Sequence, residues 1–103
     1  MRTTLDEFAF YAMDAMADDW ESLEQIAPHI ERLVGSAARE RVARLLVELV
    51  AEGLVREMEP LQYQHLTAEM ILESPKEYWF AMTEAGRALW TSERYKYDDD
   101  TVA

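Results

Sequence analysis

The chain has 103 residues, half of them hydrophobic, with no cysteine and a net charge of −11. This length suits one domain with a small core, and the lack of cysteine excludes disulfides and thiol chemistry. No apolar run approaches the roughly 20 residues of a membrane span and no signal peptide is visible, so we expect a cytoplasmic protein.

The first predicted helix begins at a capping-box pattern, Thr4-x-x-Glu7, and its apolar residues occupy two sides. Two interpretations remain open: a helix enclosed in the core, or an aromatic side that forms a dimer interface because an exposed aromatic patch is otherwise a liability. The residues of the hypothetical interface are Phe8, Tyr11, Leu89 and Trp90.

A second capping box, Ser22-x-x-Gln25, predicts the start of the next helix after a turn at residues 18–22, with Trp20 as a core anchor. Pro28 requires either a later helix start or a kink. Four carboxylates surround this helix start, where the helix dipole favours negative charge, and we interpret them as dipole partners with no metal. They are Asp18, Asp19, Glu21 and Glu24.

His29 has no partner at ligand spacing, so a surface or turn position is predicted for it. Gly35 is expected to form the turn before the third helix, residues 36–52. Ser36 is its predicted N-cap, and Gly53 ends it because glycine adopts left-handed cap geometry at little cost. An apolar stripe predicts the buried face of this helix: Val42, Leu45, Leu46, Leu49 and Val50.

The outer face of the third helix is mixed in charge. Arg39, Arg41 and Arg44 make its first half basic, whereas Glu40 and Glu48 would oppose phosphate. The small apolar side chains of Val47 and Ala51 on the same face are more typical of a protein contact.

The pattern of residues 54–58 and 77–82 predicts two strands of a hairpin. For the segment 59–76 between them, two interpretations remain open: an extended hairpin or a short helix.

Thr83 is the predicted N-cap of the last helix. Gly86 lies near the start of that helix, which indicates a close packing contact because glycine otherwise costs helix stability. We predict one domain over residues 1–96 and a frayed acidic tail over 97–103.

Two segments resemble a known family. Residues 49–58, LVAEGLVREM, resemble the end of the recognition helix in bacterial winged helix-turn-helix regulators, and residues 80–89, FAMTEAGRAL, resemble the step from wing to C-terminal helix in MarR-like and PadR-like groups. The resemblance implies a mainly α fold: a three-helix bundle, a two-stranded wing with a long insertion, and a C-terminal helix. It also implies a homodimer.

Two functions are therefore weighed. The first is a transcriptional regulator that contacts double-stranded DNA through Ser36, Arg39, Arg41, Arg44 and Lys76, with residues 36–52 as recognition helix. The second is an interaction module that binds a protein through this face or the acidic wing, consistent with the charge of −11. No phosphate loop or nucleophile pattern is present, so we expect no enzymatic activity, no cofactor and no membrane partner.

Overall fold

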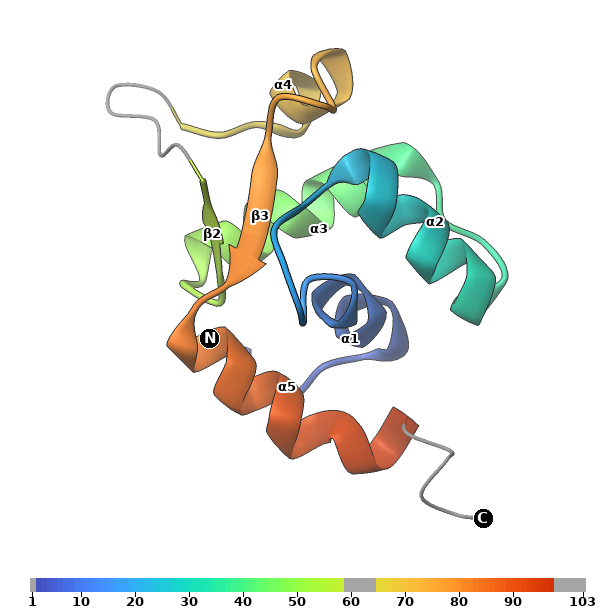
Figure 1. Cartoon of the computed structure of the whole chain (residues 1–103), viewed down its shortest axis with the longest axis vertical. Coiled ribbons are helices and arrows are strands. Elements are labelled where there is room, and N and C mark those ends of the chain that lie inside the picture. The colour runs from blue at the N-terminus through green and yellow to red at the C-terminus, as the bar shows by residue number, and fades with distance from the viewer. Residues whose placement is uncertain (1, 59–64, 98–103) are drawn as a thin grey trace.

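The computed structural model describes residues 2–58 and 65–97, which form five helices and three short strands (Figure 1). The elements in chain order are α1 (Glu7–Asp14), β1 (Glu21–Ser22), α2 (Leu23–Val34), α3 (Arg39–Ala51), β2 (Val55–Glu57), α4 (Ala68–Glu73), β3 (Trp79–Met82) and α5 (Glu84–Tyr97). The predicted mainly α domain with a small antiparallel sheet is confirmed.

The sheet has three strands in the order β1-β3-β2, with both neighbouring pairs antiparallel. Phe80 at its centre lies opposite Glu21 of β1 and Glu57 of β2. The predicted two-stranded hairpin is therefore incomplete, because the last two residues of the predicted turn, Glu21–Ser22, form a third strand. Two residues are too few to show the alternation of a strand, and β1 exists only through its pairing with β3.

The core lies between α1, α2, α3 and one face of the sheet. The predicted stripe of α3 is confirmed, since four of its five members are buried and Val50 is half-buried. Side chains from α1, α2, α3, α4 and β3 meet in the fully buried centre, represented by Met13, Ile26, Ile30, Leu46, Leu49, Ile71 and Phe80. Helical periodicity located this core correctly, because burial of one face is what the pattern encodes.

Of three predicted N-caps in the first half of the chain, one is correct. The Ser22–Gln25 capping box is present, and the Ser22 amide donates to Gln25 Oε1 at 2.9 Å. The box at Thr4 is wrong, because Asp6 is the N-cap of α1 and its Oδ1 accepts from the amide of Ala9 at 2.8 Å.

Ser36 is likewise not the N-cap of α3. Ala38 takes that position with an extended backbone and no side-chain hydrogen bond, so the N-cap lies two residues later than predicted. Gly35 and Gly53 have positive φ angles of 100° and 76°, which confirms the predicted turn before α3 and the predicted stop after it.

Pro28 lies inside α2, which begins at Leu23, so the structure excludes the first alternative, a late helix start. Trp20 is half-buried instead of anchoring the core, and the guanidinium carbon of Arg56 lies 5.1 Å from its ring centroid.

The open segment after β2 contains α4, whose N-cap Thr67 accepts from the amide of Met70. A helix is thus present in the second part of that segment, while residues 59–64 lie outside the described residues.

Helix α5 begins at the predicted cap, where Thr83 Oγ1 accepts from the amide of Gly86 at 3.0 Å. The helix reaches Tyr97, the first residue of the predicted tail, and its hydroxyl donates to the carbonyl of Leu5 at 2.7 Å. The rest of the predicted tail, 98–103, lies outside the described residues.

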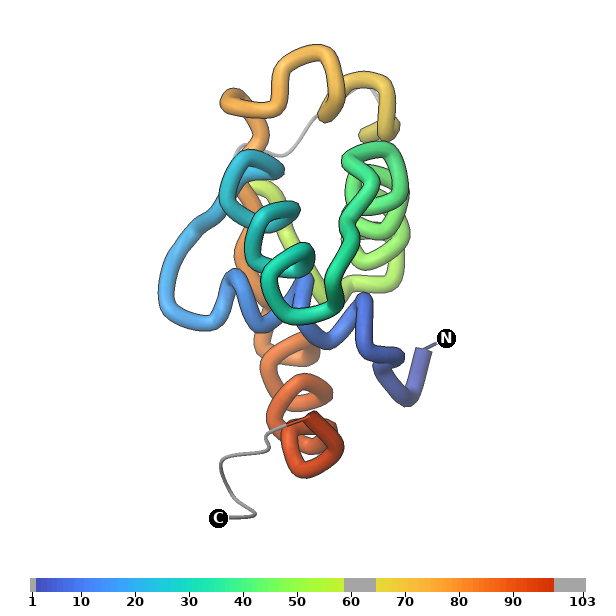
Figure 2. The backbone as a smooth tube through the Cα atoms, turned by 90° about the vertical axis from the view of Figure 1, so that its right-hand side faces the viewer, coloured from blue at the N-terminus to red at the C-terminus, as the bar shows by residue number. Residues whose placement is uncertain are grey.

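The molecule is elongated, and α4 and α5 lie at opposite ends of its long axis (Figure 2). Helices α2 and α3 lie side by side between them, with the sheet running from one end toward the other (Figures 1 and 2). None of the helices in the described part of the chain is long and apolar enough to cross a membrane.

Candidate functional site

Each of the three arginines of the predicted DNA-binding set on α3 contacts a neighbouring side chain. Arg39 Nη2 lies 2.7 Å from Glu24 Oε1 of α2. The guanidinium carbon of Arg41 lies 3.9 Å from the ring centroid of Phe8. The structure brings Arg41 and Arg44 together at one pocket, whereas Arg39 pairs with α2.

Arg44 is the most weakly held of the three. Its Nη1 lies 3.9 Å from Glu40 Oε1, and the two side chains are 63% and 70% exposed, so this pair contributes little stability. On the same side of the molecule, Arg2 lies 2.9 Å from a carboxylate oxygen of Glu52 and 3.9 Å from one of Glu48. Carboxylates thus interrupt the positive charge along the whole exposed side of α3.

The other two members of the predicted DNA-binding set lie off the helix. Ser36 is exposed in the loop between α2 and α3. Lys76 is exposed in the turn between α4 and β3, where its carbonyl accepts from Trp79 Nε1 at 2.9 Å.

The predicted interface residues are buried or half-buried within one chain. Phe8 and Trp90 are buried, and Tyr11 and Leu89 are half-buried. Phe10 supplies the contact between α1 and α5, with ring centroids 4.6 Å from Tyr97 and 6.2 Å from Trp90. This arrangement agrees with the helix enclosed in the core, and dimerisation stays a prediction.

A shallow groove of about 420 Å³ separates α3 from α4. Its lining consists of Arg44, Val47, Glu48, Leu66, Thr67, Ala68 and Glu69. We call it the α3–α4 groove. The sequence pointed to Val47 as a protein contact, but it gave no sign that α4 would lie beside it. That placement depends on Ile71, which is fully buried and anchors α4 to the core.

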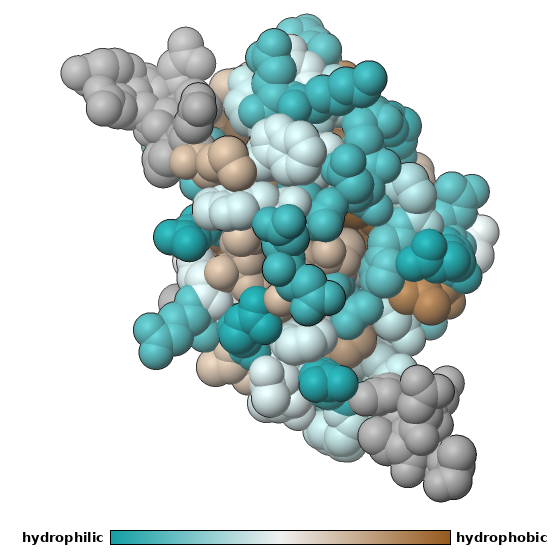
Figure 3. Space-filling view, in the orientation of Figure 1, coloured by the Kyte–Doolittle hydropathy of each residue, from teal (hydrophilic) through white to brown (hydrophobic). Residues whose placement is uncertain are grey.

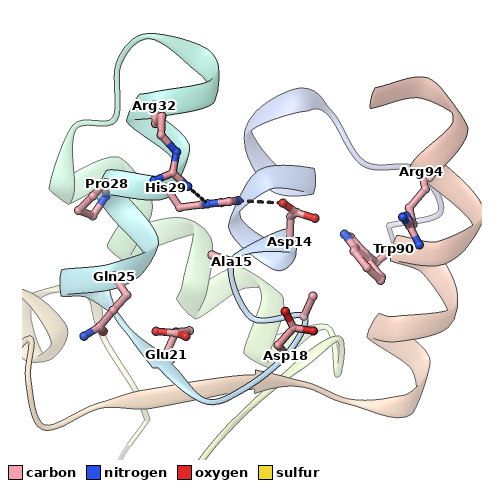
Figure 4. Close-up of a pocket in the computed structure, with 11 residues that line it drawn as sticks. Asp14, Ala15, Asp18, Glu21, Gln25, Pro28, His29, Arg32, Trp90 and Arg94 are labelled. Atoms are coloured by element: carbon pink, nitrogen blue, oxygen red, sulfur yellow. Dashed lines mark hydrogen bonds and ion pairs between the residues drawn. The ribbon is translucent and has the colours of Figure 1, made fainter. Parts of the chain in front are cut away.

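A larger groove of about 670 Å³ opens between the end of α1, α2 and α5 (Figure 4). We call it the polar groove. Its lining includes three carboxylates and three basic side chains: Asp14, Asp18, Glu21, His29, Arg32 and Arg94. Sequence reasoning missed this site because its members come from four separate segments, and only folding brings them together.

His29 is the apparent catalytic candidate in the polar groove, because its Nε2 lies 2.8 Å from Asp14 Oδ2. Arg32 Nη2 lies 2.8 Å from the other ring nitrogen, Nδ1. A guanidinium can only donate, so Nδ1 accepts and Nε2 carries the hydrogen that it donates to Asp14. Both ring nitrogens are occupied, and this geometry offers no free base for proton abstraction. His29 lies inside α2 and is half-buried, so the predicted turn position is wrong.

Two carboxyl groups have raised pKa values. Burial raises the pKa of Glu21 at the edge of the polar groove, and the nearby charge of Asp19 adds to the shift. Burial also raises the pKa of Glu57, whose Oε2 is enclosed with no hydrogen-bond partner in the described structure. Within residues 2–58 and 65–97, no group of three or more acidic or histidine side chains is arranged to hold a metal ion.

No protein-family model matches this chain, and no curated protein or solved structure matches it either. The site is therefore interpreted from its own residues.

Proposed function

We propose that the chain is a winged helix-turn-helix domain that binds another protein through the α3–α4 groove. The order of elements supports the fold, because a strand precedes α2 and the strands β2 and β3 follow α3 as the two arms of a wing. In this interpretation α3 is the recognition helix and α4 is an insertion in the wing.

The observation that carries the proposal is the charge around α3. Phosphate contacts supply most of the affinity for DNA, and they require positive charge that is not cancelled locally. Glu24 of α2 pairs with Arg39, and Glu40 lies beside Arg44. Glu69 of α4 lines the groove against the same helix. An approaching DNA backbone would meet these acidic groups together with the arginines.

The lining of the α3–α4 groove indicates the chemistry of the partner. Its apolar part comes from Val47, Leu66 and Ala68, and its acidic part from Glu48 and Glu69. A peptide with one large apolar side chain between basic residues would bury its apolar group there and place its cations near the acidic rim. The net charge of −11 attracts such a basic partner at long range.

On the face that Figure 3 shows, apolar surface appears in small areas between hydrophilic side chains. Binding to this protein is therefore expected to combine a small apolar contact with favourable electrostatics.

A defined peptide library tests the proposal. Twelve-residue peptides with one central Leu, Met or Phe and flanking Lys or Arg are compared with the same peptides in which the central residue is Ser. We expect binding in the micromolar range that needs the apolar residue and is lost in Val47→Glu. Ala51→Glu, which adds the same charge on α3 outside the groove, serves as the matched control. Equal binding by both peptide sets, or by Val47→Glu, would contradict the proposal.

DNA binding is the second candidate, and the exposed side chains of Arg41 and Arg44 are the observation in its favour. Fluorescence anisotropy with a random-sequence duplex at low salt distinguishes the two functions. Micromolar binding that Arg41→Glu with Arg44→Glu abolishes would establish DNA binding and would count against the peptide-binding proposal.

A further inference from the structure

Trp90 is the most unusual polar residue of the polar groove. Its side chain belongs to α5 and is only 8% exposed, yet its indole nitrogen Nε1 has no hydrogen-bond partner in the described structure. Trp79 provides a contrast, since its Nε1 donates to the carbonyl of Lys76. A buried donor without an acceptor is destabilised, so a group that satisfies it gains affinity.

Figure 4 shows that the indole nitrogen of Trp90 is directed into the polar groove, toward the end of α1. Arg94 lies beside it on α5, with its guanidinium carbon 5.0 Å from the Trp90 ring centroid. A ligand atom that accepts a hydrogen bond from this nitrogen would therefore also lie near a positive charge.

The opposite part of the groove is acidic. Asp18 and Glu21 lie together at the edge of the groove away from Arg32, as Figure 4 shows. Asp14 lies between His29 and Trp90 in Figure 4, and its carboxylate is already engaged by His29. The groove thus separates an acidic part from a site that combines a hydrogen-bond donor with a positive charge.

We propose that the polar groove binds a small zwitterion of the amino-acid type. Its carboxylate accepts from Trp90 Nε1 close to Arg94, and its ammonium group lies near Asp18 and Glu21. A simple cation would leave the indole N–H unsatisfied, and a simple anion would face the carboxylates of the groove. Apolar wall is also available for a side chain, from Ala15, Ala17 and Pro28.

The indole N–H resonance of Trp90 reports directly on this contact. In ¹⁵N-labelled protein, each common amino acid is added at about 5 mM, which detects dissociation constants in the millimolar range. We expect at least one of them to shift the Trp90 indole resonance saturably and to leave that of Trp79 unchanged, because Trp79 already has an acceptor. Trp90→Phe assigns the resonance. If no amino acid shifts it, the proposal is refuted.

The role of each ligand charge is tested on the unmodified protein. The N-acetyl derivative of the binding amino acid lacks the ammonium group, and its amide derivative lacks the carboxylate. Each is expected to bind at least about tenfold more weakly, a factor equal to about 1.4 kcal/mol. Equal binding by either derivative would overturn the zwitterion assignment.

The protein side is tested with Asp18→Asn combined with Glu21→Gln, which keeps the shapes of both side chains. This variant is expected to weaken binding by about tenfold or more. Asp19→Asn is the matched control, because it removes a charge from the same turn but not from the groove lining. Unchanged affinity in the double variant would contradict the proposal, and the derivative comparison remains decisive if that variant fails to fold.

Discussion

Gly86 offers the sharpest test of how α5 is attached to the sheet. A Cβ atom at this position would lie 1.9 Å from the carbonyl oxygen of Leu54, whereas real Cβ contacts below 3.0 Å essentially never occur. The Leu54 carbonyl also accepts from the amide of Thr83 at 3.1 Å, so the obstacle is backbone that is itself held in place. Gly86→Ala must therefore displace the start of α5 or the start of the wing by about 1 Å.

The expected loss of stability is the sum of two unfavourable contributions and one favourable contribution. Overpacking of this kind costs about 1–3 kcal/mol, and weakening the Thr83–Leu54 hydrogen bond adds about 1 kcal/mol. Alanine recovers at most about 1 kcal/mol through its higher helix propensity. We expect the free energy of unfolding to fall by about 2 kcal/mol and the melting temperature by about 10 °C.

Urea unfolding followed by circular dichroism measures this loss. Ala88→Gly, an exposed position in the same helix, is the control for propensity alone and is expected to cost about 1 kcal/mol. If Gly86→Ala were as stable as the wild type or more stable, the close approach of α5 to Leu54 would be wrong.

Three further substitutions test other contacts. Ser22→Ala removes the side chain of a capping box and should lower the free energy of unfolding by about 1 kcal/mol in urea titrations. Glu93→Gln should destabilise at neutral pH, because hydrogen bonds from the Leu5 amide and Lys96 hold the pKa of Glu93 below its ordinary value of 4.5. That difference should disappear as pH falls below about 4.5. Glu57→Gln should stabilise at neutral pH, since burial raises the pKa of Glu57 above 4.5 and disfavours its charged form.

Each of these predictions would be contradicted by a specific result. Ser92→Ala removes an exposed hydroxyl and should change stability by less than about 0.5 kcal/mol, so an equal loss in both serine variants would argue against a specific cap. For Glu93, a stability difference that grew on acidification would have the wrong sign for a lowered pKa. For Glu57, the advantage of the glutamine variant must shrink on acidification, as the wild-type carboxyl takes up a proton.

The sequence predicted a structural feature correctly where the residues that form it are close together in the chain. The capping box of α2 spans four residues, and the two positive-φ glycines end their helices without help from elsewhere. The cap at Thr4 failed because Asp6 offers a competing side-chain acceptor two residues later. Ser36 failed similarly, since Ala38 adopts the extended cap conformation in its place.

The features that sequence reasoning missed depend on contacts between distant residues. Strand β1 exists because Glu21 pairs with Phe80, and His29 has a partner because α2 lies beside the end of α1. Pro28 is accepted inside α2 because Ala27 before it and Ile30 two residues after it are buried and hold the helix in place. The polar groove was beyond prediction for the same reason, as its walls come from α1, β1, α2 and α5.

The hydrogen bonds between the two ends of the described chain affect how the protein folds during its synthesis on the ribosome. The first turn of the structure is held by α5, through the Leu5 amide bound to Glu93 and the Leu5 carbonyl bound to the hydroxyl of Tyr97. These contacts join residues 88 and 92 positions apart, so they cannot form until nearly all of the described chain has left the ribosome. Helix α1 is synthesised first, but the residues before it lack these contacts while α2, α3 and the wing emerge. Closing so long a loop occurs late in folding, because its entropy cost must be met before the contacts form. The chain segment before α1 is therefore expected to become fixed only after α5 has been synthesised.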